Sequence, residues 1–171
     1  RRILFSITHR YGVWMKLILF CFVGLISYQI LAQDLMVERI RKISSKKKSV
    51  YFNKGIFHNG APAVKAVLKK VRHSFVKKNG YERIVFDFSS NKLPRIYGHV
   101  SKSEKRLYLD FFKTNLDSAI GSFGNSKYVD SINFFPIDKQ SLSVELIYKE
   151  NVKVEVFYLD SPARLVVDIR G

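Results

Sequence analysis

The stretch RLYLD at Arg106 to Asp110 returns 58 positions later as RLVVD at Arg164 to Asp168. Other apolar positions keep the same offset: Ile84, Phe86 and Phe88 match Leu142, Val144 and Leu146, and Ile96 matches Val154. In each matched stretch apolar and polar residues alternate, which is the period of a half-buried strand. A duplicated set of such strands predicts two similar sheets that bury their apolar faces against each other.

Eight strands are expected, four in each half. We place them at about Leu68 to Val76, Tyr81 to Phe88, Arg95 to Val100, Arg106 to Phe112, Tyr128 to Phe135, Leu142 to Tyr148, Lys153 to Tyr158 and Arg164 to Ile169. Turn residues such as Asn79-Gly80 and Ser161-Pro162 separate them. Short strands at this spacing predict an all-β fold, a sandwich of two similar four-stranded antiparallel sheets built from an internal repeat.

Residues 64 to 76 are compatible with two structures. Their apolar residues fall at helical spacing, namely Val64, Val67, Leu68, Val71 and Phe75. The repeat needs a strand here, because the second half carries Val129, Ile132 and Phe134 at the same place. We therefore favour a strand and keep a helix as the alternative.

The residues before the repeat indicate export. Met15-Lys16 precedes an apolar run from Leu17 that closes at Ala32, the pattern of a secretory signal peptide. We expect residues 15–32 to be a signal peptide cleaved after Ala32 or, alternatively, an uncleaved anchor, although the run is shorter than the roughly 20 residues that span a bilayer. Residues 1–14 lack an initiator Met, so we interpret them as a non-native upstream extension or as a sign that the sequence is a fragment.

The net charge of +16 is concentrated ahead of the repeat. Residues Gln33 to Gly80 contain 13 Lys and Arg and 2 Asp and Glu, a net charge of +11. Residues Tyr81 to Gly171 contain 13 Lys and Arg and 12 Asp and Glu, a net charge of +1. We therefore expect a basic leader or linker, residues 33–66, and a nearly neutral domain, residues 67–171. Together with export, this distribution argues against a nucleic-acid partner. The run Lys46 to Lys48 is interpreted as a solvated linker that would meet membrane lipid only if the signal segment stays uncleaved.

Three predicted strands carry Arg, an apolar residue and an acid at alternate positions, so the three side chains share an outward face. One interpretation is structural, since Arg and Asp on neighbouring strands stabilise a sheet by a few tenths to about 1 kcal/mol per pair. The other interpretation is functional: the Arg guanidinium groups bind carboxylates of a polar polymer, and the Tyr rings pack on the faces of its sugars. The candidate ligand-binding residues are Arg83, Asp87, Arg95, Tyr97, Arg106, Tyr108, Asp110, Arg164 and Asp168.

Patterns that carry catalysis or hold metals are missing from the sequence. The histidines show no metal-ligand spacing, and no nucleophile elbow, phosphate-cradling Gly loop or HExxH is found. Asp110 and Asp168 each follow an Arg by four residues, which would keep both ionised rather than split their pKa values for acid–base work. The single cysteine, Cys21, lies in the signal segment. We therefore expect a protein that is not an enzyme and that uses no cofactor and no metal.

Four motifs in order resemble the AMIN domain. The first half carries RIVFDFS at Arg83 to Ser89 and KRLYLDF at Lys105 to Phe111, and the second half carries SVELIY at Ser143 to Tyr148 and DSPARLVVDIRG at Asp160 to Gly171. The resemblance covers Val67 to Gly171 and departs at the first strand, where VRHSFV is followed by a longer turn. It implies a periplasmic β-sandwich of two similar sheets, of the kind found in N-acetylmuramoyl-L-alanine amidases and type IV pilus secretins.

The resemblance implies peptidoglycan as the partner. We therefore expect a non-catalytic, periplasmic cell-envelope module that attaches to peptidoglycan and localises itself or a fused or partner protein. One alternative is an envelope assembly protein that binds another protein through an exposed edge strand. The other is the N-terminal targeting part of a truncated amidase, whose zinc domain would lie downstream.

Overall fold

The computed structural model describes residues 40–121, 123–138 and 140–171. The signal segment expected at residues 15–32 and the extension at residues 1–14 lie outside this range. Within it, no helix is long and apolar enough to cross a membrane. Residues Ile40–Gly171 form one of two units of the chain, and it is the only one described below.

Strands account for nearly all regular structure in the described residues. In chain order they are β1 (Arg41–Lys42), β2 (Gly55–His58), β3 (Ala66–Val76), β4 (Tyr81–Phe88), β5 (Ile96–Ser101), β6 (Arg106–Phe112), β7 (Thr114–Leu116), β8 (Phe123–Gly124), β9 (Val129–Asp138), β10 (Ser141–Tyr148), β11 (Lys153–Leu159) and β12 (Arg164–Arg170). A short 3-10 turn, η1 (Lys77–Asn79), joins β3 to β4.

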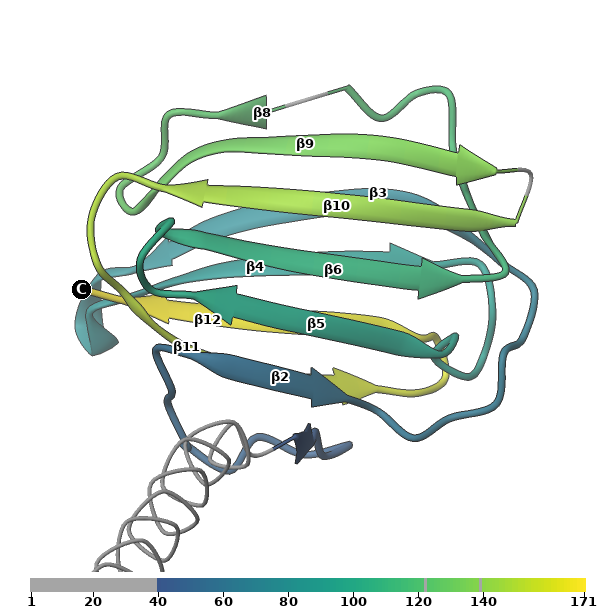
Figure 1. Cartoon of the computed structure of the whole chain (residues 1–171), viewed down its shortest axis with the longest axis horizontal. Helices are drawn as coiled ribbons and strands as arrows, with labels where there is room; N and C mark the ends of the chain where they lie inside the picture. Colours follow the sequence, from purple (N-terminus) through teal and green to yellow (C-terminus); the bar gives the residue numbers. More distant parts are fainter. Residues whose placement is uncertain (1–39, 122, 139) are drawn as a thin grey trace, which may run out of the picture. The chain divides into compact units, whose positions relative to one another are not determined.

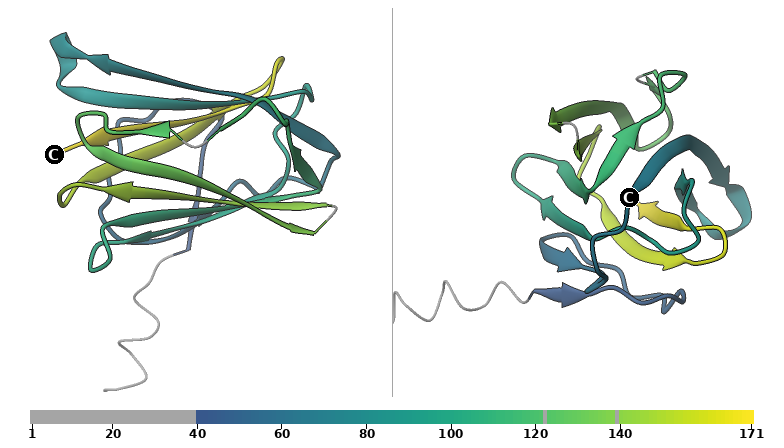
Figure 2. Two further views of the ribbon diagram at one scale, coloured as in Figure 1. Left: turned by 90° about the horizontal axis from the view of Figure 1, so that it is seen from above. Right: turned by 90° about the vertical axis from the view of Figure 1, so that its right-hand side faces the viewer.

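The strands form two open, mixed sheets that lie face to face, consistent with a sandwich (Figure 1). Sheet A has the order β1-β2-β5-β6-β10-β9-β8, and sheet B has the order β11-β12-β4-β3-β7. The two layers are seen edge-on in Figure 2, left. The all-β prediction is confirmed.

The expected pair of four-stranded antiparallel sheets is wrong in strand number and in direction. Sheet A has seven strands and sheet B has five, and the pairs β1–β2 and β3–β7 are parallel. The additional strands come from two segments that are not among the eight strands expected from the sequence. The leader supplies β1 and β2, and the connection after β6 supplies β7 and β8.

Each half of the chain contributes to both sheets. Strands β3 and β4 lie in sheet B and β5 and β6 in sheet A, whereas β9 and β10 lie in sheet A and β11 and β12 in sheet B. The central pairs, β6 with β10 and β4 with β12, therefore join strands from different halves. Neither sheet is the product of one half alone.

The core lies between the sheets and follows the alternation read from the sequence. On β6, Leu107, Leu109 and Phe111 are fully buried, and on β12 the inward residues are Leu165, Val167 and Ile169. Rings meet across the two layers: Phe111 lies 5.8 Å from Phe86 and 5.2 Å from Phe88, measured between centroids. The prediction that the alternating strands bury their apolar faces against each other is confirmed.

The ambiguous segment is the strand β3 and not a helix. It pairs antiparallel with β4 from Leu68 to Val76, with a bulge between Leu68 and Lys70. Its turn closes at Gly80, where φ is 64°, a left-handed conformation that glycine adopts without steric cost. Pairing with β4 satisfies the backbone polar groups on one side of β3.

The leader also enters the core. Phe57 of β2 has no exposed surface, and its ring fills the space above Gly98 of β5, its cross-strand neighbour. A Cβ at Gly98 would lie 2.1 Å from the Phe57 ring. This strand is not among the eight expected from the sequence, because its four residues, GIFH, are too few to display a period.

Candidate functional site

The residues proposed from the sequence are divided between the outer faces of the two sheets. Sheet B carries Arg83, Asp87, Arg164 and Asp168 on β4 and β12. Sheet A carries Tyr97 on β5 and Arg106, Tyr108 and Asp110 on β6, with Arg95 directly before β5. Arg95 is exposed, and its Nε donates to the carbonyl of Ala61 at 3.1 Å. The two groups are separated by the core, so they cannot form one site.

On sheet B, Asp168 is enclosed by cations. Its side chain has no exposed surface, and it accepts two hydrogen bonds from Arg83, at 2.6 Å and 2.8 Å. Lys47 Nζ lies 2.5 Å from Asp168 Oδ2, which also accepts one of the two hydrogen bonds from Arg83. The hydrogen bond to Asp168 raises the pKa of Arg83. Burial by itself would lower the pKa of Lys47, but the hydrogen bond and charge of Asp168 outweigh it and raise that pKa.

A segment of the leader, residues 44–52, covers this part of sheet B; we call it the leader arch. Both of its ends bond to the edge of β11, since Tyr158 N donates to Ser44 O at 3.0 Å and Phe52 N to Val154 O at 2.8 Å. Between these ends, the backbone N–H groups of Lys48 and Ser49 donate to Glu155 Oε1. The run Lys46 to Lys48, interpreted above as a solvated linker, thus includes a lysine held in an ion pair.

The other two candidates on sheet B have different surroundings. Asp87 lies opposite Arg164 in the register but binds Arg72 of β3 instead, at 2.6 Å and 2.8 Å. Arg164 Nε is buried and has no hydrogen-bond partner among the described residues. Because Asp168 is enclosed and Asp87 is paired, we place the candidate ligand-binding face on the other sheet.

The outer face of sheet A, which we call the open face, is built from two rows of side chains that cross five strands. The first row is His58, Tyr97, Asp110, Ser143 and Phe135. The second row is Ile56, His99, Tyr108, Glu145 and Asn133. At about 4.8 Å between strands, each row spans about 19 Å. Such a row is long enough to contact more than one unit of a linear polymer.

Aromatic rings gather where β2, β5 and β6 meet the open face. His58 stacks on Tyr97 with a centroid distance of 5.8 Å, and His99 stacks on Tyr108 at 6.1 Å. Phe112 meets Tyr97 edge to face, at 5.8 Å. Tyr97 remains 44% exposed, Phe112 38% and Phe135, at the far end of its row, 49%. The contacting rings of His58, Tyr97 and Phe112 therefore form a continuous aromatic surface, and Phe135 is a separate exposed ring.

Polar groups between the rings are held by one another. Arg106 Nη1 lies 2.6 Å from Glu145 Oε1, and the Ser143 hydroxyl donates to Asp110. Tyr108 Oη donates to Glu104 at 2.8 Å, which lowers the pKa of Glu104 and raises that of Tyr108. The face can therefore offer oriented donors and acceptors beside the aromatic surface without rearranging.

The sequence reading missed several members of the open face, chiefly His58, Phe112 and Phe135. The alternation on β6 could have found Phe112, because it lies two residues after Asp110 and so shares its face. Placing His58 on this face requires the strand β2, which was not expected from the sequence. Placing Phe135 there requires the register between β9 and β10, which includes a bulge.

In the described residues, no group of three or more His, Cys, Asp or Glu side chains could hold a metal ion. The fold and this face define an all-β, two-sheet protein with an exposed aromatic and polar surface. No family model matches the sequence, and no curated protein shows significant similarity to it.

Proposed function

We propose that this protein is a non-catalytic cell-envelope binding module of the AMIN type that attaches to peptidoglycan through its open face. The observation that supports it most is the pair of cross-strand rows, which combine exposed rings with oriented polar groups on one face of a sheet. Sugar rings present apolar faces and a rim of hydroxyl and acyl groups, so a ligand of that kind complements both parts of the surface.

The strand order is also what a duplicated AMIN-type unit would produce. A shift of 58 residues carries β5 and β6 onto β11 and β12, and β4 onto β10. The central order β5-β6-β10-β9 of sheet A then corresponds to β11-β12-β4-β3 of sheet B. We propose that an internal repeat underlies this correspondence.

Attachment to peptidoglycan requires a periplasmic location, and this part of the proposal depends on the signal segment expected at residues 15–32. Its role in the cell would be to localise itself or a fused or partner protein. Weak contacts repeated along one polymer would together give useful retention.

Cosedimentation with purified sacculi tests the proposal. We expect the protein to pellet with sacculi at low salt. Tyr97→Ala together with Tyr108→Ala should weaken binding about 30-fold, because each ring contributes on the order of 1 kcal/mol and the two together about 2 kcal/mol. Val50→Ala is the control, since Val50 is an exposed apolar residue on the leader arch and away from the open face. Wild-type protein that stays entirely in the supernatant would refute the proposal.

A second candidate function, binding of an envelope protein, is favoured by the edge of β3. The parallel strand β7 pairs only with Ala66 to Leu68, so from Lys69 to Val76 no described residue pairs with the outer edge of β3. An extended, acidic segment of a partner could add there as a strand. Lysines on an edge strand also protect against unwanted pairing, which ranks this candidate second.

Site-specific photocrosslinking separates the two functions. A crosslinker at Ser74, on the β3 edge, reports protein partners, and one at Tyr97 reports contacts of the open face. Muropeptides recovered from Tyr97 support the first proposal. A single envelope protein recovered from Ser74, with no muropeptide from either position, would favour the second.

A further inference from the structure

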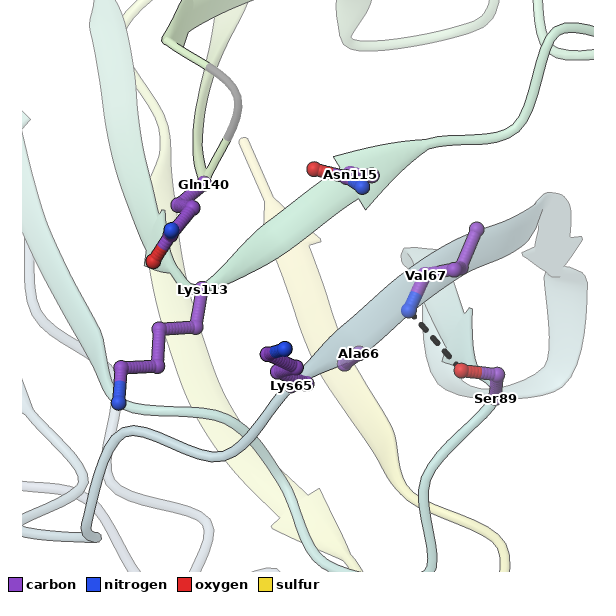
Figure 3. A pocket seen from close by; sticks show the side chains of 7 residues that line it. All are labelled: Lys65, Ala66, Val67, Ser89, Lys113, Asn115 and Gln140. Carbon is purple, nitrogen blue, oxygen red and sulfur yellow. Dashed lines mark hydrogen bonds between the residues drawn. The ribbon is translucent and has the colours of Figure 1, made fainter.

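A pocket of about 390 Å³ opens at one end of the two sheets, separate from the rows of the open face. Four segments meet there: the start of β3, the residue after β4, the link between β6 and β7, and the turn between β9 and β10. Figure 3 shows Gln140 and Lys113 on one side of the pocket, Val67 and Ser89 on the other, and Lys65 between them.

Backbone hydrogen bonds hold these segments together. Ala66 N donates to Lys113 O at 3.0 Å, and Thr114 N donates to Gln140 O at 3.0 Å. On the opposite side, Val67 N donates to the Ser89 hydroxyl at 2.9 Å. The pocket is therefore preformed, which lowers the entropy that a ligand must overcome on binding.

The charged residues that line the pocket are both basic. Lys65 and Lys113 line it with the amides of Asn115 and Gln140, and no acid is present in the lining. Across the described part of the chain, no ion pair involves either lysine. Lysine ammonium groups and side-chain amides are hydrogen-bond donors that suit a carboxylate. The volume is at the small end of ligand pockets and exceeds the needs of an isolated ion.

The pocket adjoins the aromatic surface. Phe112, whose ring meets Tyr97 at 5.8 Å, is the residue directly before Lys113. The rings of His58, Tyr97 and Phe112 therefore lead along one end of sheet A towards the pocket. A polymer lying on these rings would bring its side branches to the two lysines.

We propose that the pocket formed by Lys65 and Lys113 binds the carboxylate of a short peptide branch on a glycan whose sugars lie on the open face. This assignment rests on the proposed function and adds the chemical group that the pocket selects. It predicts that binding depends on free carboxylates in the ligand and not only on its sugars.

The test is an NMR titration of backbone amides with a soluble disaccharide–peptide fragment that has free carboxylates, and with the same fragment after carboxyl amidation. The test variant is Lys65→Gln with Lys113→Asn; Asn tolerates the left-handed conformation at this position, where φ is 52°. The control is Lys77→Gln with Lys78→Gln, an equal change of charge beyond the other end of β3, a strand about 33 Å long.

We expect wild-type protein and the control to bind the free-carboxylate fragment about tenfold more tightly than the amidated one. The test variant should bind both forms equally, at the affinity of the amidated form. A test variant that keeps the preference would overturn the assignment, as would shifts at Tyr97 and Phe112 without shifts at Val67, Lys113 and Asn115.

Failure of the pocket and failure of the proposed function give different results. If wild-type protein binds sacculi and binds the two fragments with equal affinity, the proposed function stands and the assignment of the pocket is wrong. If wild-type protein binds neither sacculi nor fragments, the proposed function is wrong. A titration with a free acetylated dipeptide, followed at the backbone amides of the pocket, then tests carboxylate binding by the pocket alone. No shift in that titration would overturn the pocket as well.

Discussion

Two aspartates in the same sequence motif have opposite surroundings. Asp87 and Asp168 each close an Arg–apolar–acid pattern on a strand of sheet B. Asp168 is enclosed by Arg83 and Lys47 beneath the leader arch, whereas Asp87 pairs with Arg72 at the surface. The motif predicts an outward direction, but the segment that packs on the face decides whether the carboxylate meets water.

This difference predicts unequal effects of the same substitution. We expect Asp168→Asn to reduce the free energy of unfolding by about 2 kcal/mol, below the usual range for a broken buried pair because Arg83 and Lys47 remain partly exposed. Asp87→Asn is the matched control, with an expected loss below about 1 kcal/mol. Urea unfolding measures both, and equal losses would contradict the assignment of Asp168 to the structural core of this face.

Tyr148 gives a prediction that depends on pH. Its hydroxyl is buried with no hydrogen-bond partner among the described residues, and burial raises its pKa well above the ordinary value of 10.0. The folded state therefore keeps the proton that the unfolded chain releases above pH 10, so stability is lost as the pH rises through this value. Because unfolding then releases one proton, each further pH unit lowers the free energy of unfolding by about 1.4 kcal/mol.

We expect Tyr148→Phe to be neutral or stabilising by up to about 1 kcal/mol at pH 7, because it removes an unpaired buried hydroxyl. Above pH 10 the variant should lose stability less steeply than the wild type. Urea unfolding at pH 7, 10 and 11 measures the difference. Stability curves that run parallel over this range would show that Tyr148 ionises in the folded state as it does in the unfolded chain.

At the scale of elements, the attachment of β2 depends on one residue without a side chain. Gly98 leaves the space that the Phe57 ring occupies, and through this contact a four-residue strand of the leader becomes part of sheet A. His58, the next residue, then lies beside Tyr97 on the open face. The contact of Phe57 with Gly98 in the core thus positions the ring of His58 on the outer side of β2.

Gly98→Ala should therefore displace Phe57 and destabilise the fold by about 1–3 kcal/mol, the usual effect of overpacking. Phe57→Ala should cost about 3–5 kcal/mol. In the double variant, the added cost of Gly98→Ala should nearly vanish, because the clash is gone. Chemical unfolding of the three variants measures this coupling, and additive losses would contradict it.

At the scale of the whole molecule, the two halves depend on each other. Each sheet has a central pair that joins them, β6 with β10 and β4 with β12. A half by itself would expose these strands as unpaired edges and would leave both apolar faces without a partner.

We therefore expect residues 40–120 and residues 121–171, made as separate polypeptides, to be unfolded alone and to form a folded complex when mixed. The uncut chain from residue 40 to residue 171 is the control. Far-UV circular dichroism and amide NMR dispersion measure the gain of structure. A half that folds by itself with dispersed signals would show that the pairing between halves is not required.

The sequence by itself determined the eight alternating strands between Leu68 and Ile169 and which of their residues face inward, because alternation is a local property of a strand. It also identified Tyr97 and Tyr108 as outward residues. Only the tertiary structure decided how the strands are shared between the sheets, that Phe57 enters the core and that Lys47 meets Asp168, 121 positions away. These contacts join segments distant in sequence, where packing and charge depend on position in space and leave no periodic pattern in the chain.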